Sequence, residues 1–130
     1  MNDPCKPLRY STMDLQQRVA TLGHQIRDSI RGVLDSLPEG QQGPQVLARS
    51  LTLDKVLLSR VLKTARCKDP IGVAYHVPGK EPMRRFYKAA RRRGADGDSV
   101  AAGEESITAF DALVREEVGD RSSLDALLSS

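Results

Sequence analysis

The sequence predicts an all-α fold, and three observations support this prediction. Apolar residues recur at spacings of three and four over several segments, which is the period of an amphipathic helix. Capping residues or prolines precede these segments, and glycine or proline follows them. Aromatic residues make up only 4% of the chain and Trp is absent, so the core must be built from Leu, Val, Ile and Ala, as in helical bundles. We expect the 130 residues to form a single domain, 1–130.

The chain begins with a predicted loose arm and a long helix. Residues 1–12 contain Pro4 and Pro7 and have no apolar period, so we expect them to form the arm. The helix is expected over 13–37, before Pro38 and Gly40, and its apolar stripe begins with Leu15, Val19, Leu22 and Ile26. This stripe covers fewer than two clean heptads, so packing against the protein's own core is preferred over pairing with a second helix.

The middle of the chain predicts two short helices and a turn over 44–67. Pro44 opens the first helix, which extends to about residue 50. A turn over 51–53 follows, and Asp54 is placed to cap the second helix with its side chain. Asp69 then precedes a further short helix over 70–77. Alternating apolar residues make a strand the alternative there, which would give a winged variant of the fold.

The C-terminal part predicts a basic helix followed by acidic helices. The basic helix spans 82–93, between Pro82 and Gly94. The acidic helices span 98–128: one helix extends to about residue 118, and a short terminal helix begins near Ser122 and Ser123.

Charge is distributed unevenly along the chain. Residues 1–43 are neutral, residues 44–93 carry thirteen basic groups against three carboxylates, and residues 94–130 carry two basic groups against nine carboxylates. The net charges are therefore 0, +10 and −7. A basic block of this size is typical of a surface that binds a polyanion. The alternative is that the basic and acidic parts neutralise each other within the fold or across a dimer.

Residues 47–62 carry the motif on which the functional prediction depends, and they read LARSLTLDKVLLSRVL. Two helices that cross over a short turn need a small residue at the crossing, and Ala48 supplies it. Leu53 closes the turn, and the second helix has an inner stripe of Leu58, Val61, Leu62 and Ala65. The segment resembles the helix-turn-helix of bacterial transcriptional regulators, with Thr52 where that family prefers Gly.

This resemblance implies a DNA-binding surface on the second helix, which lies in the major groove in this class. Carried over by position, Lys55, Val56 and Arg60 would face bases, with Arg60 able to bond guanine and Val56 able to contact a thymine methyl group. Ser59 would face the DNA backbone, and Lys63 would reach a phosphate. The alternative is that Val56 and its apolar neighbour Leu57 are buried under another helix.

The second basic feature is the run over 84–93, which has six cations and no carboxylate. We expect it to clamp DNA phosphates through Arg84, Arg85, Lys88, Arg91 and Arg92. The alternative is pairing with carboxylates of the following helix, namely Glu104, Glu105, Glu116 and Glu117.

Other classes of function have little support in the sequence. His24 and His76 are isolated, and no glycine-rich phosphate loop is present. We therefore expect no catalytic centre, no cofactor and no metal site. No apolar stretch reaches the ~20 residues that span a bilayer, and the N-terminus does not resemble a signal peptide. These features predict a cytoplasmic protein without membrane contact, in which Cys5 and Cys67 are free thiols.

The sequence thus predicts a DNA-binding transcriptional regulator that uses a helix-turn-helix to read duplex DNA. A homodimer is expected because one such module reads half a site, with the contact supplied by the 13–37 helix or by the C-terminal helices. The alternative is a helical protein–protein interaction module whose helix-turn-helix does not bind DNA. Exposure of Lys55, Val56, Ser59 and Arg60 beside Arg84 and Arg91 would favour DNA binding, whereas their burial under residues 99–128 would favour the alternative.

Overall fold

The computed structural model describes residues 12–119, 123, 124 and 126. Six helices account for most of these residues, and none of them forms a strand. Their bounds are α1 Thr12–Ser36, α2 Pro44–Leu51, α3 Lys55–Arg66, α4 Pro70–His76, α5 Lys80–Arg92 and α6 Gly97–Glu117. The all-α prediction is therefore confirmed. The predicted arm, except for Thr12, and most of the predicted terminal helix lie outside the described residues.

The segment after Asp69 is helix α4, so the predicted helix is right and the strand alternative is wrong. The Asp69 carboxylate accepts a hydrogen bond from the N–H of Ile71 at 3.1 Å, and Pro70 occupies the first turn. Both features start a helix, because the cap satisfies a free N–H and proline fixes a helical φ. The winged variant, which needed a strand here, is excluded with it.

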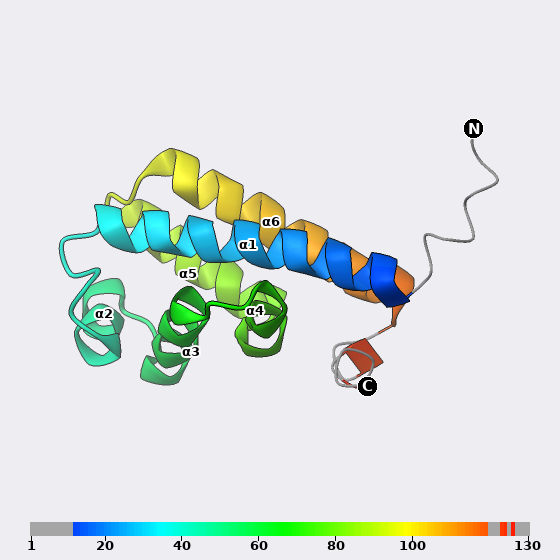
Figure 1. Ribbon diagram of the computed structural model, residues 1–130. Coiled ribbons are helices and arrows are strands. Elements are labelled where there is room, and N and C mark those ends of the chain that lie inside the picture. Colours follow the sequence, from blue (N-terminus) through cyan, green and yellow to red (C-terminus); the bar gives the residue numbers. More distant parts are fainter. Residues whose placement is uncertain (1–11, 120–122, 125, 127–130) are drawn as a thin grey trace.

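Helix α1 is the central element of the fold (Figure 1). It packs against α6 along much of its length and also contacts α3 and α4, while α5 packs on α6 and touches α2. The predicted apolar stripe of α1 supplies the contact surface: Leu15, Val19 and Ile26 are buried in the core, and Leu22 packs against it. As expected, this stripe serves the protein's own core. It is therefore not free to form a dimer contact.

Close approach of α4 to α1 depends on Gly23. A Cβ atom at this position would lie 2.2 Å from the carbonyl oxygen of Pro70, which is a backbone atom that cannot rotate away. The absence of a side chain at residue 23 thus lets the start of α4 rest directly on α1. This contact also fixes the position of the 67–69 segment that joins α3 to α4.

A buried hydroxyl pair joins α1 to α5. The Ser29 Oγ donates to the carbonyl of Ile26 at 2.8 Å, so its lone pairs are left to accept from the Tyr87 hydroxyl, 2.9 Å away. A Cβ atom at Gly103 of α6 would lie 2.3 Å from the Tyr87 ring. The Tyr87 side chain therefore fills the junction of α1, α5 and α6, and burial raises the pKa of its hydroxyl well above the usual range.

We predict that this tyrosine makes stability fall at high pH. Unfolded tyrosine ionises near pH ~10, whereas folded Tyr87 keeps its proton to higher pH because its pKa is raised. The stability that depends on neutral Tyr87 is present below pH ~10 and declines above it, by up to ~1.4 kcal/mol per pH unit. Urea unfolding of wild type and Tyr87→Phe between neutral and alkaline pH measures this.

The Tyr87→Phe variant should lose about 1 kcal/mol at neutral pH through its missing hydrogen bond. Its stability should then fall less steeply than that of the wild type as the pH rises. Parallel curves for the two proteins above pH ~10 would contradict the assignment of the alkaline loss to Tyr87.

Candidate nucleic-acid interface

Helices α2 and α3 are joined by a turn over residues 52–54. Thr52 adopts the left-handed conformation with φ 57° and ψ 49°, which is the backbone state that glycine would adopt most easily. Within the turn, the N–H of Leu53 donates to the carbonyl of Ala48 at 2.9 Å. Thr52 therefore has the left-handed backbone conformation for which the resembled pattern uses Gly.

The residues predicted to pack α2 against α3 are buried. They are Ala48 of α2 and Leu58, Val61, Leu62 and Ala65 of α3, and Leu53 packs partly buried against them. Leu47 and Leu51 of α2 are buried beside them. One local prediction was wrong: Asp54 occupies the N-cap position of α3, but its side chain accepts no capping hydrogen bond. The Asp54 side chain is exposed, so its carboxylate is hydrated and the first N–H groups of α3 are left to solvent.

The opposite face of α3 is solvent-exposed and basic. At about 100° per residue, the exposed residues fall in one arc of the helix, and they are Lys55, Val56, Ser59, Arg60 and Lys63. Val56 is 65% exposed, whereas Leu57 is 7% exposed and belongs to the core. The alternative that both apolar residues are covered by another helix is therefore wrong for Val56. No ion pair among the described residues engages Lys55, Arg60 or Lys63.

Arg66 extends this face and was not among the residues predicted from the sequence. Its side chain is exposed at the last turn of α3, three residues after Lys63 and seven after Ser59. A groove of about 460 Å³ continues from here towards α4, and it is lined by Pro44, Ser59, Leu62, Lys63, Arg66, Cys67 and His76. The helical spacing of residues 59, 63 and 66 was the signal that could have identified Arg66.

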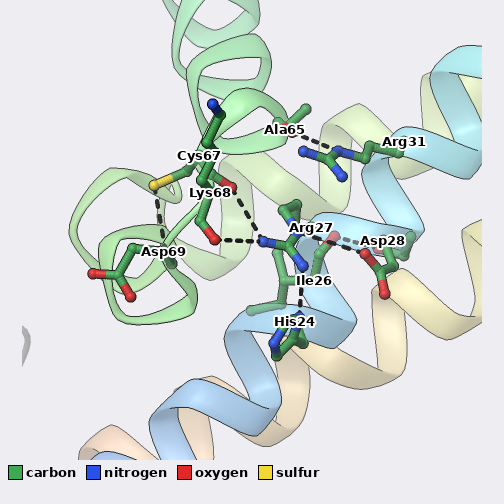
Figure 2. Close-up of polar contacts among 10 residues, drawn as sticks. His24, Ile26, Arg27, Asp28, Arg31, Ala65, Cys67, Lys68 and Asp69 are labelled. Atoms are coloured by element: carbon green, nitrogen blue, oxygen red, sulfur yellow. Dashed lines mark hydrogen bonds and ion pairs between the residues drawn. The ribbon is translucent and has the colours of Figure 1, made fainter.

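Two arginines of α1 hold the C-terminal end of α3 (Figure 2). The Arg27 Nη1 donates to the carbonyls of Cys67 and Lys68 at 3.2 and 3.0 Å, and the Arg31 Nε donates to the carbonyl of Ala65 at 2.7 Å. The last carbonyls of a helix have no partner inside it, and the end of the helix carries partial negative charge. The guanidinium groups donate hydrogen bonds to these carbonyls and place positive charge at the negative end of the helix.

Arg27 is only 8% exposed, so its own charge must be accommodated. Its Nη2 donates to the Nδ1 of His24 at 2.6 Å, and its Nε lies 3.5 Å from the Asp28 carboxylate without a hydrogen bond. Since arginine can only donate, the Nδ1 of His24 accepts and carries no proton. His24 and Asp28 therefore support a buried arginine, a role that the sequence did not indicate.

The basic run lies on α5, which begins two residues earlier than predicted. The buried face of α5 includes Met83, Phe86, Tyr87, Ala89 and Ala90, and the cations of the run over 84–93 are exposed. Three of the arginines of the run have acidic partners: Arg84 with Glu81 at 3.1 Å, Arg91 with Glu104 at 3.2 Å, and Arg93 with Glu39 at 2.6 Å. No ion pair among the described residues engages Arg85, Lys88 or Arg92.

The sequence offered two interpretations of the basic run, a phosphate clamp and pairing with carboxylates of the following helix. The observed contacts support each of them in part. Of the four glutamates proposed as partners, Glu104 pairs with the run through Arg91, and Glu117 pairs instead with Arg18 of α1 at 3.5 Å. A further partner of the run is Glu39, which lies before α2, and its hydrogen bonds with Arg93 and Ser50 hold its pKa below the usual value. The run is thus partly neutralised and partly free.

Comparisons with protein-family models, with curated proteins and with solved structures found no match. Within the described part of the chain, no helix combines the length and apolar character needed to cross a bilayer. The same residues contain no group of three or more metal-ligating side chains placed to share an ion.

We predict that Arg27→Ala destabilises the protein by about 2–3 kcal/mol, because it removes charge-assisted hydrogen bonds to two carbonyls near the end of α3. Arg31→Ala is the matched control, since Arg31 lies one turn further along α1, is exposed and donates to one carbonyl. Chemical denaturation followed by circular dichroism measures both. Equal losses for the two variants would show that burial of Arg27 does not increase its contribution to the free energy of unfolding.

Proposed function

We propose that the protein binds duplex DNA through α3, as a helix-turn-helix transcriptional regulator. The observation that supports this best is the exposed face of α3, whose cations are unpaired among the described residues while its opposite face is packed into the core. A helix that reads a groove needs this division, because the side chains that contact bases must be free and the helix itself must be rigid.

In this proposal the exposed side chains of α3 have distinct tasks. Lys55, Val56 and Arg60 face base edges, where Arg60 donates to a guanine and the exposed Val56 side chain contacts a thymine methyl group. Ser59 contacts the DNA backbone, and Lys63 contacts a phosphate. Arg66 lies on the same exposed side and adds a second phosphate contact.

A homodimer remains part of the proposal, since a single module reads only half a site. The stripe of α1 that begins at Leu15 is buried in the protomer. In this proposal the C-terminal helices, the other candidate from the sequence, supply the contact.

The second candidate function is a protein-interaction module, and one groove favours it. A depression of about 680 Å³ runs between α1 and α6, lined by Gln25, Asp28, Ser29, Asp98, Ser99, Ala102, Glu105, Ser106 and Ala109. Its three charged residues are all acidic. Gln25 and Ser29 lie on the side of α1 turned away from Arg27 and Arg31, at about 100° per residue. A basic protein segment could bind there without involving α3.

The test of DNA binding is fluorescence anisotropy with a labelled random-sequence duplex at several salt concentrations. Wild type should bind at low salt and weaken steeply as salt rises, because bound cations release counterions from the phosphates. The variant Lys55→Ala/Arg60→Ala should lose roughly tenfold or more in affinity at low salt, because binding to random-sequence duplex is electrostatic and the variant removes two cations from the exposed face of α3.

The matched control is Lys80→Ala/Arg115→Ala, which removes the same two types of charge from α5 and α6. It should bind nearly as well as wild type. Absence of salt-sensitive binding in wild type would reject the DNA-binding proposal and favour the interaction module. Equal losses in the two variants would show that general charge, and not the α3 face, controls binding.

A further inference from the structure

The cations of α5 divide into two sets by their partners. Arg84 and Arg91 are held by Glu81 and Glu104, at 3.1 and 3.2 Å. Arg85, Lys88 and Arg92 are exposed, and no ion pair among the described residues engages them. A solvent-exposed ion pair contributes little to stability, but a paired cation must give up its carboxylate before it can bind a phosphate. The unpaired set can therefore bind a polyanion without first breaking an ion pair, whereas the paired set cannot.

The two sets also lie on different sides of the helix. At about 100° per residue, Arg85, Lys88 and Arg92 fall within an arc of about 60°. Arg84 and Arg91 lie about 20° apart on the flank turned towards α6, where Arg84 shares a small pocket with Tyr87 and Ile107. The unpaired set forms a straight stripe, and its ends are about 10.5 Å apart along the helix axis at ~1.5 Å per residue.

The stripe ends next to the turn that precedes α3. A hollow of about 390 Å³ is lined by Ser50, Leu51, Thr52, Ala89, Arg92 and Arg93. Arg92 therefore borders the residues that place the N-terminus of α3, and the base-facing Lys55 is the first residue of that helix. One end of the stripe, at Arg92, thus lies beside the turn that leads into α3.

We propose that Arg85, Lys88 and Arg92 form a phosphate-binding stripe that contacts one DNA strand beside the groove read by α3. Each DNA strand presents one phosphate per ~3.4 Å of helix axis, so the stripe spans the length of about three phosphates. Arg84 and Arg91 belong to the internal ion pairs and do not contact DNA. This inference rests on the proposed function and divides the predicted clamp into residues that bind and residues that do not.

The chain supplies a matched pair of variants for the test. Arg85→Gln/Arg92→Gln and Arg84→Gln/Arg91→Gln each remove two arginines, seven residues apart, from the same helix. Both retain exposed polar side chains, and circular dichroism melting checks that both fold like wild type. Binding of the full chain to a labelled random-sequence duplex is measured over a salt series, and log K is plotted against log salt concentration.

We expect Arg85→Gln/Arg92→Gln to reduce the magnitude of the salt slope by about 1.8, at ~0.9 per phosphate contact. The loss should be the same on duplexes of different sequence, because phosphate contacts carry no sequence information. Arg84→Gln/Arg91→Gln should leave the slope close to that of wild type.

Equal reductions in the two variants, or a larger one in Arg84→Gln/Arg91→Gln, would overturn the stripe while leaving the proposed function intact. Failure of wild type to bind duplex at low salt would overturn the proposed function and the stripe together. A reduced slope in Arg85→Gln/Arg92→Gln, with no effect of Lys55→Ala/Arg60→Ala, would support the stripe and reject contact between DNA and the exposed face of α3.

Discussion

The hydrogen bonds from Arg27 and Arg31 to the end of α3 are the interactions on which the candidate site depends. They join the longest helix of the fold to the helix whose outer face is exposed. The carbonyls that accept these bonds would otherwise be unpaired at a helix end. Because Arg27 is buried, its position cannot shift without leaving a charge uncompensated. The orientation of α3 is thus fixed by two residues of α1, which contact its C-terminal end and lie outside its exposed face.

Much of the fold could be predicted from the sequence because its signals are local. Pro44 and Asp69 mark helix starts, and the apolar period of α1 predicted which of its residues would be buried. The inner stripe of α3 was predicted in the same way. The strand alternative over 71–77 arose because a seven-residue helix is too short for its apolar period to be distinguished from alternation.

The candidate site was less accessible to such reasoning, since it depends on contacts between distant segments. The acidic partner of Arg93 is Glu39, fifty-four residues away, and that of Arg91 is Glu104 on another helix. A run of cations in a sequence carries no information about which of them a fold will neutralise. Likewise, Arg27 has no neighbour in sequence that indicates its bonds to residues 67 and 68. The exposed face of α3, with Arg66 at its end, was predictable, but the arginines of α1 that hold the helix were not.

The acidic groove between α1 and α6 and the basic residues of α3 and α5 give the molecule an electric dipole moment. In the field of a polyanion such a molecule experiences a torque before any contact is made. This torque turns its basic side towards the polyanion. The time spent in unproductive orientations is then shortened, and association becomes faster at low ionic strength. In the proposed complex with DNA, the groove carboxylates Asp98 and Glu105 would thus influence the approach to the partner without touching it.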